Sequence, residues 1–249
     1  MLFSEQCTLC GICAKVCPNG VHELDAAGHK LHKEKCTLCG ACDEVCPSFA
    51  VEISGERMNA SQVTERLMRD KAYYEASGGG ITLSGGEPLA QFDFTREILL
   101  LAKDAGLHTC VDTSGWGGRA AELVELVDLF LWDIKETDAQ QHIYATGVEL
   151  EPLMSSMRDI SAAGGKIALR CPIIPGLNDR EAHMRDIAVI ADGIQGVVSI
   201  ELISYHRLGM AKAEAIGHAQ EEFSLLTSED RAELMEKLIR CTGIPARWI

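Results

Sequence analysis

The sequence predicts an α/β protein in which a parallel sheet or barrel follows a small cysteine-rich domain. Eight of the eleven cysteines lie between residues 7 and 46. From residue 81 onward, apolar segments alternate with amphipathic ones in five successive units, which is the pattern of a parallel sheet. Charged residues and a histidine follow the apolar segments, at the strand ends where parallel α/β proteins bind ligands. We therefore expect the cysteine-rich domain over residues 1–56 and the α/β domain over residues 57–249.

The composition excludes several classes of function. A net charge of −14 argues against a nucleic-acid or an anionic-membrane partner. No apolar run is long enough to span a bilayer, and Met1–Cys17 lacks the basic and apolar stretches of a signal peptide. Because the cysteine spacing described next does not suit a secreted disulfide framework, we expect a reducing, cytoplasmic location.

The cysteine-rich domain carries one pattern twice. Cys-x2-Cys-x2-Cys-x3-Cys-Pro spans residues 7–18 and again residues 36–47. This is the ligand run of a bacterial two-cluster ferredoxin, in which three thiolates hold one [4Fe–4S] cluster and the fourth holds the other. Zinc or disulfides are the alternatives, and a complete run that occurs twice, each time closed by proline, argues against both. The expected ligands are Cys7, Cys10, Cys13 and Cys46 for one cluster, and Cys36, Cys39, Cys42 and Cys17 for the other.

The rest of this domain offers weaker signals. Between the two runs, residues 19–35 carry His22, His29 and His32, which we expect in a solvated loop because eight thiolates already satisfy two clusters. Phe49–Ile53 is expected to form a closing strand before a turn at Gly55.

The α/β domain begins around a glycine-rich strand. Ile81–Leu83 is a short β-branched run between two glycine clusters, so it predicts a strand that stops abruptly. Gly85 and Gly86 lack a Cβ, which lets backbone lie directly against a ligand. Glu87 then presents a carboxylate and Pro88 opens the next helix. This stretch predicts a cradle for a small cationic ligand.

The later elements follow in regular order. Further strands are expected at residues 108–113, 129–134, 166–174, 198–204 and 247–249, and helices at 59–70, 94–105, 120–127, 152–163, 180–191 and 229–241. Five polar residues fall at or just after the carboxyl ends of strands, namely Glu87, Asp112, Asp133, Lys135 and His206. Each alone could be a surface residue, but five at one edge predict a site. Arg170 lies mid-strand and joins that site only if its side chain points inward.

These residues resemble a known family. Asp70–Gln91, with its Ser-Gly-Gly-Glu-Pro, closely resembles the glycyl radical enzyme activating enzymes, which are radical S-adenosylmethionine (SAM) proteins. The resemblance covers nearly the whole chain and includes Asp112-Thr113-Ser114-Gly115, Asp133-Ile134-Lys135, His142, Thr146-Gly147, Arg170 with Pro175-Gly176-x-Asn178-Asp179, and Tyr205-His206-x2-Gly209-x2-Lys212. The two-cluster insertion is similar to that of members acting on enzymes other than pyruvate formate-lyase.

The resemblance implies a site and a reaction. Ser84, Gly85, Gly86 and Glu87 would bind the methionine amino group of SAM, and Asp133, Ile134, Lys135, Arg170 and His206 would contact the rest of it. Asp112, Thr113 and Asp133 would hold a monovalent cation. A reduced [4Fe–4S] cluster would cleave SAM to methionine and a 5′-deoxyadenosyl radical, which abstracts hydrogen from the glycine loop of a partner glycyl radical enzyme. The implied fold is a six-unit partial radical SAM barrel, and the implied electron donor is a flavodoxin or ferredoxin.

The sequence departs from the family in one respect. The family ligates its catalytic cluster with Cys-x3-Cys-x2-Cys, and this sequence contains no such motif. Cys110, Cys171 and Cys241 cannot supply it by their spacing, so the chain has no catalytic cysteines, and five of six barrel units are recognisable. One interpretation is a fragment that cleaves no SAM as given, with a third cluster only in a full-length form and one sheet edge exposed. The alternative is a shortened iron–sulfur electron-transfer protein that does not cleave SAM.

Overall fold

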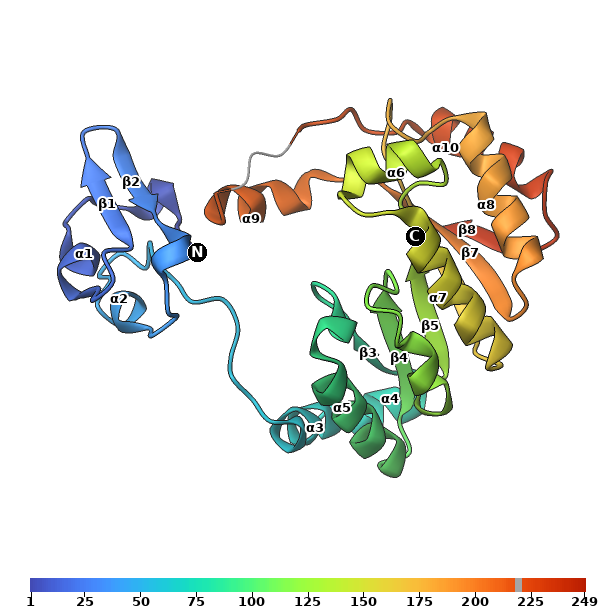
Figure 1. Cartoon of the computed structure of the whole chain (residues 1–249), viewed down its shortest axis with the longest axis horizontal. Coiled ribbons are helices and arrows are strands. Elements are labelled where there is room, and N and C mark those ends of the chain that lie inside the picture. The colour runs from blue at the N-terminus through green and yellow to red at the C-terminus, as the bar shows by residue number, and fades with distance from the viewer. Residues whose placement is uncertain (218–220) are drawn as a thin grey trace. The chain divides into compact units, whose positions relative to one another are not determined.

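The chain folds into two compact units. The computed structural model describes residues 1–217 and 221–249 (Figure 1). One unit contains Met1–Arg57 together with His206–Glu222, and the other contains Met58–Tyr205 together with Phe223–Ile249. The first unit therefore includes a late stretch of chain that lies outside the domain expected over residues 1–56. The expected boundary itself stays a prediction.

The first unit is built from short elements. They are η1 (Ser4–Gln6), α1 (Ile12–Val16), β1 (His22–Asp25), β2 (Gly28–Leu31), η2 (Lys33–Lys35), α2 (Ala41–Glu44), η5 (Arg207–Gly209) and α9 (Met210–Ala215), where η denotes a 3₁₀ helix. Its amino terminus is tied down on both sides, because the Leu2 N–H donates to the Ala215 carbonyl (2.9 Å) and the Phe3 N–H donates to the Ala50 carbonyl (2.8 Å).

Two expectations for this unit are wrong. The segment with the three histidines is not a solvated loop, because β1 and β2 pair as an antiparallel hairpin. Its turn is stabilised by Asp25, whose Oδ1 accepts hydrogen bonds from the Ala27 and Gly28 N–H groups. The closing strand expected over Phe49–Ile53 does not form. Val51 makes only an isolated antiparallel bridge to Leu2, flanked by backbone hydrogen bonds from the Glu52 N–H to the Met1 carbonyl and from the Phe3 N–H to the Ala50 carbonyl.

The second unit is a parallel sheet, as the sequence predicts. Its six strands run in the order β3-β4-β5-β6-β7-β8, and every neighbouring pair is parallel. The strands are β3 (Gly80–Leu83), β4 (His108–Thr113), β5 (Leu129–Asp133), β6 (Ile167–Ile173), β7 (Val197–Ser204) and β8 (Ala246–Trp248). The strands β3 and β8 are the edges of this sheet.

Helices connect these strands. They are α3 (Ala60–Met68), α4 (Lys71–Ser77), η3 (Pro88–Gln91), α5 (Phe92–Asp104), η4 (Ala120–Leu126), α6 (Ala139–Thr146), α7 (Leu150–Ala162), α8 (Glu181–Gly193) and α10 (Ser228–Ile239). Asn59 caps α3 in a capping box with Gln62, at the residue where the helix predicted over 59–70 begins. Residues 120–126 form a 3₁₀ helix, where the sequence predicts a helix without specifying its type.

The two faces of the sheet differ in chemistry. One face packs its apolar side chains, among them Val111, Phe130 and Ile200, against helix side chains in the larger of two buried clusters. Helices lie along the sheet in Figure 1. The opposite face carries the alternate residues of the same strands, because side chains alternate along a strand. Near the carboxyl ends those alternate residues are charged. No described helix is long and apolar enough to cross a membrane.

Candidate cofactor sites

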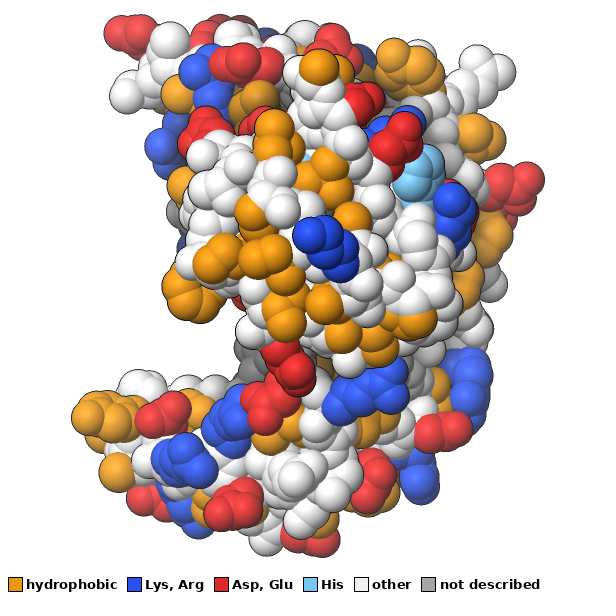
Figure 2. All heavy atoms as spheres, turned by 90° about the vertical axis from the view of Figure 1, so that its left-hand side faces the viewer, with side chains coloured by type: hydrophobic (Ala, Val, Ile, Leu, Met, Phe, Trp, Pro, Cys, Tyr) orange, Lys and Arg blue, Asp and Glu red, His pale blue; other side chains and the backbone are white. Residues whose placement is uncertain are grey.

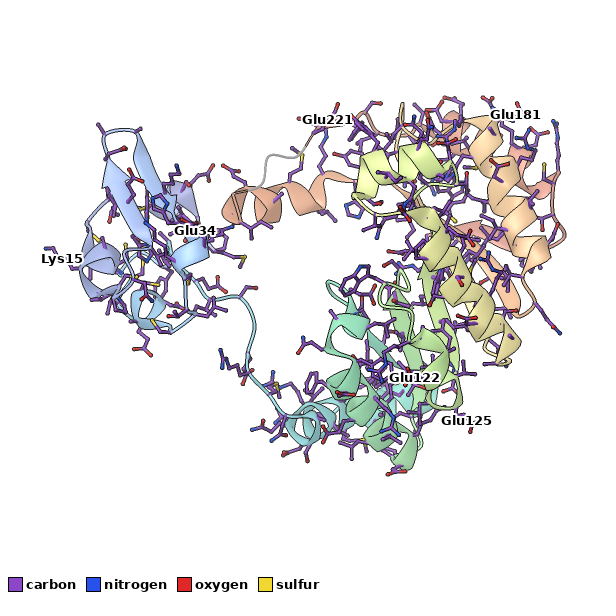
Figure 3. All side chains as sticks on the ribbon, in the orientation of Figure 1. Lys15, Glu34, Glu122, Glu125, Glu181 and Glu221 are labelled. Atoms are coloured by element: carbon purple, nitrogen blue, oxygen red, sulfur yellow. The ribbon has the colours of Figure 1, made fainter. Side chains whose placement is uncertain are left out.

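The eight clustered cysteines of the first unit meet at two cavities. Figure 3 shows the sulfur atoms of this unit gathered between its helices and its hairpin. One cavity is lined by Cys7, Cys10, Cys13 and Cys46, and the other by Cys17, Cys36, Cys39 and Cys42. These are the two sets of four thiols that the sequence predicts as ligands. Four thiols around one cavity are the donor set of a [4Fe–4S] cluster, so these residues fit such a group.

The two cysteine loops share an unusual backbone. Leu9 and Leu38, at equivalent positions of the repeated Thr-Leu-Cys-Gly, have φ of 56° and 54°. Such strained residues cluster at ligand sites. Here they bring backbone N–H groups toward sulfur, and the Leu38 N–H donates to Cys36 Sγ (3.4 Å).

Backbone groups and burial set the acidity of these thiols. A hydrogen bond from the Val21 backbone lowers the pKa of Cys17, which favours the thiolate that binds metal. Burial raises the pKa of Cys13 and of Cys42, and in each case nearby cysteines add to the effect. A cluster has to displace the protons of these two buried thiols when it binds.

A pair of histidines lies beside the first cavity, and the sequence reasoning missed it. His29 Nδ1 is 3.3 Å from Cys7 Sγ, and His29 Nε2 is 2.9 Å from His22 Nδ1. Burial lowers the pKa of both imidazoles. Residues 22–25 alternate inward and outward, His-Glu-Leu-Asp, and a turn follows. That alternation is the signal that could have predicted a strand and an inward histidine.

Large apolar side chains are exposed near these cavities. Ile12 lines one cavity and Leu38 the other, and Leu9 and Phe49 are also exposed. Figure 2 shows apolar side chains gathered on the face of the molecule that it presents. Exposed apolar patches of this kind mark protein interaction sites.

The second unit gathers charged residues across its sheet. Asp133, Arg170, Glu201 and Arg247 are register partners on four adjacent strands, so their side chains share one face. Arg170 Nη1 donates to Asp112 Oδ2 (2.7 Å), and the Ser84 hydroxyl donates to the same oxygen (3.0 Å). The structure thus brings Ser84, Asp112 and Arg170 together, and Arg170 does point to the site face. Arg170 Nε is buried and has no hydrogen-bond partner among the described residues.

Glu87 is held in place by the neighbouring strand. Its Oε1 accepts from the Thr113 hydroxyl (2.5 Å) and the Leu89 N–H, and its Oε2 accepts from the N–H and hydroxyl of Ser114. These four bonds fill the usual acceptor positions of a carboxylate. Gly85 and Gly86 have φ of 83° and 69°, and a Cβ at either would meet open space. The loop is therefore fixed by Glu87 and open at its glycines.

The Asp-Ile-Lys segment follows at the end of β5. Lys135 Nζ lies 3.3 Å from Asp133 Oδ2. Burial raises the pKa of Asp133, and repulsion from Asp112 adds to the rise while Lys135 opposes it. Ile134 is buried, and its backbone N–H donates to the Arg170 carbonyl. Ile134 therefore has its side chain in the core, unlike Asp133.

A buried network secures the loops that carry these residues. Asn178, 1% exposed, accepts from the Ile174 N–H and donates to the carbonyls of Pro172 and Lys135. Glu136, equally buried, pairs with Arg180 and accepts from the Asp138 N–H. The sequence reasoning assigned no role to Glu136 or Arg180.

His206 lies in the first unit. It follows Tyr205 after β7 with an extended backbone (φ −143°). Its expected contact with SAM stays a prediction. The side chain of Lys212 lies outside the described part of the chain.

The fold and the cysteine cavities define a class, and comparisons with known proteins agree with it. The Radical SAM superfamily matches residues 33–187, and the 4Fe-4S dicluster domain matches residues 6–50. A crystal structure of a domain of pyruvate-formate lyase-activating enzyme from Bacteroides vulgatus has the same fold. It superposes with a TM-score of 0.58 at 24% identity, covering 69% of this chain and 99% of that one.

The relatives narrow the class. The chain is 33% identical over its whole length to the choline trimethylamine-lyase activating enzyme of Oleidesulfovibrio alaskensis, of which it covers 84%. It is 33% identical over 96% of its length to the trans-4-hydroxy-L-proline dehydratase activating enzyme of Clostridioides difficile, of which it covers 81%. The chain belongs to the glycyl radical enzyme activating enzymes of the radical SAM superfamily. It is thus an oxidoreductase of the iron–sulfur and SAM-dependent kind, and its partner is a glycyl radical enzyme.

Proposed function

We propose that this protein installs a glycyl radical on its partner by using SAM bound at the carboxyl ends of the parallel strands. The contact of Ser84, Asp112 and Arg170, next to the open glycines of the β3 loop, is the observation that carries the proposal. When bound beside a reduced [4Fe–4S] cluster, SAM supplies a 5′-deoxyadenosyl radical that takes a hydrogen atom from a glycine of the partner.

The residues of the site suit the two charged ends of the methionine part of SAM. Carbonyl oxygens of Ser84, Gly85 and Gly86 accept from the ammonium group. Glu87 adds negative charge but has no free acceptor position, so we assign it the shaping of this loop. Arg170 Nε, which makes no hydrogen bond among the described residues and lies 3.8 Å from Glu201 Oε2, is the donor that we propose for the carboxylate group.

The other acidic groups at the site have further roles in this proposal. Asp133 and Lys135 face the remainder of SAM, with Ile134 contributing only backbone, and a contact of His206 with SAM stays a prediction. Asp112, Thr113 and Asp133 are the residues proposed for a monovalent cation, since hard cations prefer oxygen ligands.

We further propose that the eight clustered thiols hold two [4Fe–4S] clusters that relay electrons. No three of the eleven cysteines form Cys-x3-Cys-x2-Cys. The cluster that reduces SAM therefore needs ligands other than these cysteines, and we assign it to a third cluster of a full-length form. In that form, Cys10→Ala and Cys39→Ala should slow reductive cleavage of SAM if the relay operates. Unchanged cleavage in both would contradict the relay.

We also propose that the external electron donor docks on the exposed apolar surface near the clusters. Leu9, Leu38 and Phe49 are 47%, 62% and 77% exposed, and small redox proteins use such patches for transient contacts. A flavodoxin or ferredoxin fits this role. We propose a reducing, cytoplasmic location because free thiols persist in reducing compartments, and the net charge of −14 makes nucleic acid and anionic membranes poor partners.

SAM binding tests the site directly. Arg170→Ala should weaken the binding of SAM, measured by equilibrium dialysis, by about tenfold or more because it removes a charged hydrogen bond. Arg119→Ala, at an exposed pair with Glu122 on η4 (labelled in Figure 3), should bind as the parent does. If Arg170→Ala and the parent bind SAM equally, the proposed site is wrong.

The electron-transfer alternative predicts a different outcome. A shortened iron–sulfur carrier would load both clusters but would not cleave SAM. A full-length form that raises no glycyl radical signal by electron paramagnetic resonance on any glycyl radical enzyme encoded nearby would favour this alternative.

A further inference from the structure

The imidazoles of His22 and His29 lie between the two cysteine cavities. His29 lines the cavity of Cys7, Cys10, Cys13 and Cys46, and His22 lines the cavity of Cys17, Cys36, Cys39 and Cys42. The two rings contact each other through His29 Nε2 and His22 Nδ1 at 2.9 Å. Their centroids are 5.1 Å apart, with the planes tilted by 46°. A continuous line of contacts therefore runs from Cys7 through both rings to the second cavity.

The direction of the hydrogen bonds follows from the contacts of His29. A sulfur ligand of a cluster is an acceptor, and His29 has two such neighbours, Cys7 Sγ at 3.3 Å from Nδ1 and Cys13 Sγ at 4.0 Å from Nε2. We assign the proton to Nδ1 because the sulfur there is the closer one, so that His29 donates to Cys7. A neutral imidazole has one N–H, which leaves His29 Nε2 as an acceptor for the N–H of His22 Nδ1. His22 Nε2 is then a lone-pair atom, and it is buried without a partner among the described residues.

The two neutral rings thus use their two N–H groups on Cys7 Sγ and on His29 Nε2. The sulfur of Cys7 receives a hydrogen bond from this pair, whereas His22, which lines the second cavity, has no N–H left to donate there. N–H···S hydrogen bonds stabilise the extra negative charge of a reduced cluster, and they are one determinant of its reduction potential.

We propose that His22 and His29 form a hydrogen-bonded bridge between the two cluster sites, in which His29 donates to the Cys7 sulfur and raises the reduction potential of the cluster held there. The bridge makes the two clusters unequal, so that an electron entering the unit settles first on the Cys7 cluster. This inference rests on the proposed assignment of eight thiols to two clusters, which the iron content tests separately.

The test is a potentiometric titration of the reconstituted protein followed by electron paramagnetic resonance. His29→Leu removes the donor, and it should lower one of the two potentials by about 59 mV, which is a tenfold change for one electron. His29→Gln keeps an N–H and should restore part of the shift. His32→Gln is the matched control, because His32 lies in the same segment, bonds to Glu23 instead, and lines neither cavity.

Assigning the shift needs one more variant. Combined with Cys39→Ala, which removes a ligand of the second cluster, His29→Leu should still lower the potential of the cluster that remains. A shift that disappears in this background belongs to the other cluster and overturns the proposal. Equal potentials in His29→Leu and the parent, at full iron content, overturn it as well.

A measurement without variants covers the case in which His29→Leu fails to load iron. Pulsed electron paramagnetic resonance of the reduced protein, labelled with ¹⁵N-histidine, should detect one weakly coupled imidazole nitrogen and an exchangeable proton. The absence of such a coupling would overturn the proposal. Binding of one zinc ion that depends on Cys13, His22 and His29 also overturns it, since their ligand atoms lie within 4.8 Å of one another and would then form a mononuclear site.

Discussion

Gly115 occupies a position with no room for a side chain. Its φ is 81°, and a Cβ there would lie 2.1 Å from Cη2 of Trp132. Trp132 is fully buried at the centre of the core, so its ring cannot move away cheaply. The glycine that ends Asp112-Thr113-Ser114-Gly115 therefore serves core packing, while Thr113 and Ser114 hold Glu87.

A pair of glycine variants separates this clash from backbone strain. Gly115→Ala and Gly118→Ala both place alanine at positive φ, which costs about 1–2 kcal/mol, but Gly118 has open space around it. Gly115→Ala should lower the free energy of unfolding by about 1–3 kcal/mol more than Gly118→Ala, because overpacking adds to the strain. Urea unfolding followed by tryptophan fluorescence measures the difference. Equal losses would show that the Trp132 ring yields.

His183 should make the second unit sensitive to acid. Burial lowers its pKa to about 4, whereas an unfolded histidine titrates near 6.5. Between these two pKa values, His183 is protonated in the unfolded chain but neutral in the native state. Stability should therefore be complete above about pH 6.5 and should fall by up to about 3 kcal/mol as the pH drops to about 4.

The Glu136 carboxyl beside His183 also makes stability fall as the pH drops, but at a lower pH. Burial raises the pKa of Glu136, whereas hydrogen bonds from Arg180 and Asp138 lower it by more, so this contribution is lost only as the pH falls further. His183→Gln should flatten the loss of stability between pH 6.5 and 4. All three tryptophans lie in the second unit, so their fluorescence reports this loss. A slope that is as steep in the variant as in the parent would assign the acid sensitivity to other groups.

At the scale of elements, Asn178 joins two strand ends. Its side chain links the residue after β6 to the carbonyl of Lys135 after β5, and so it fixes the loop that presents Lys135.

Asn178→Ala should cost about 3 kcal/mol or more, because it leaves three buried backbone groups unsatisfied at about 1 kcal/mol or more each. It should also weaken SAM binding by releasing Lys135. Asp179→Ala is the control, since Asp179 makes one exposed bond to the Gly176 N–H. Calorimetry and equilibrium dialysis measure the two effects. An Asn178→Ala protein as stable as the control would mean that water replaces the amide.

The long periodic elements could be predicted, and the short ones could not. The strand predicted over residues 108–113 has those bounds as β4, because Gly106 and Gly115 mark turns just outside its two ends. The hairpin of β1 and β2 was missed because each strand has only four residues, so that the alternation in residues 22–25 is a weak signal. The short helices α4 and α6 were missed for the same reason.

The sequence predicted which residues lie at the site but not which of them bond to one another. Strand ends identified Asp112, Asp133 and Lys135, since parallel strands share one edge. Sequence spacing alone could not show that Arg170 bonds Asp112 across 58 positions, nor that Glu87 is fully occupied by Thr113, Ser114 and Leu89. Those contacts depend on the register between strands, which only the folded sheet fixes.

At the scale of the whole molecule, the two units can be tested by metal content. After anaerobic reconstitution this chain should hold about eight irons, as two [4Fe–4S] clusters. Cys10→Ala and Cys39→Ala should each lower the iron and sulfide content, because each removes a ligand from a different cavity. Cys241→Ala is the control, since Cys241 is exposed and belongs to neither cavity. About twelve irons in this chain would refute the ligand assignment.

The first unit consists of two stretches of chain, Met1–Arg57 and His206–Glu222, that are far apart in the gene. Leu2 bonds Ala215 across that separation, and both residues are buried. Recombination that exchanged the cysteine-rich segment alone would bring a new residue 2 against the Ala215 of the recipient. We therefore expect the two stretches to change together during divergence. The sequence of the segment after β7 should then correlate with that of the cysteine-rich segment.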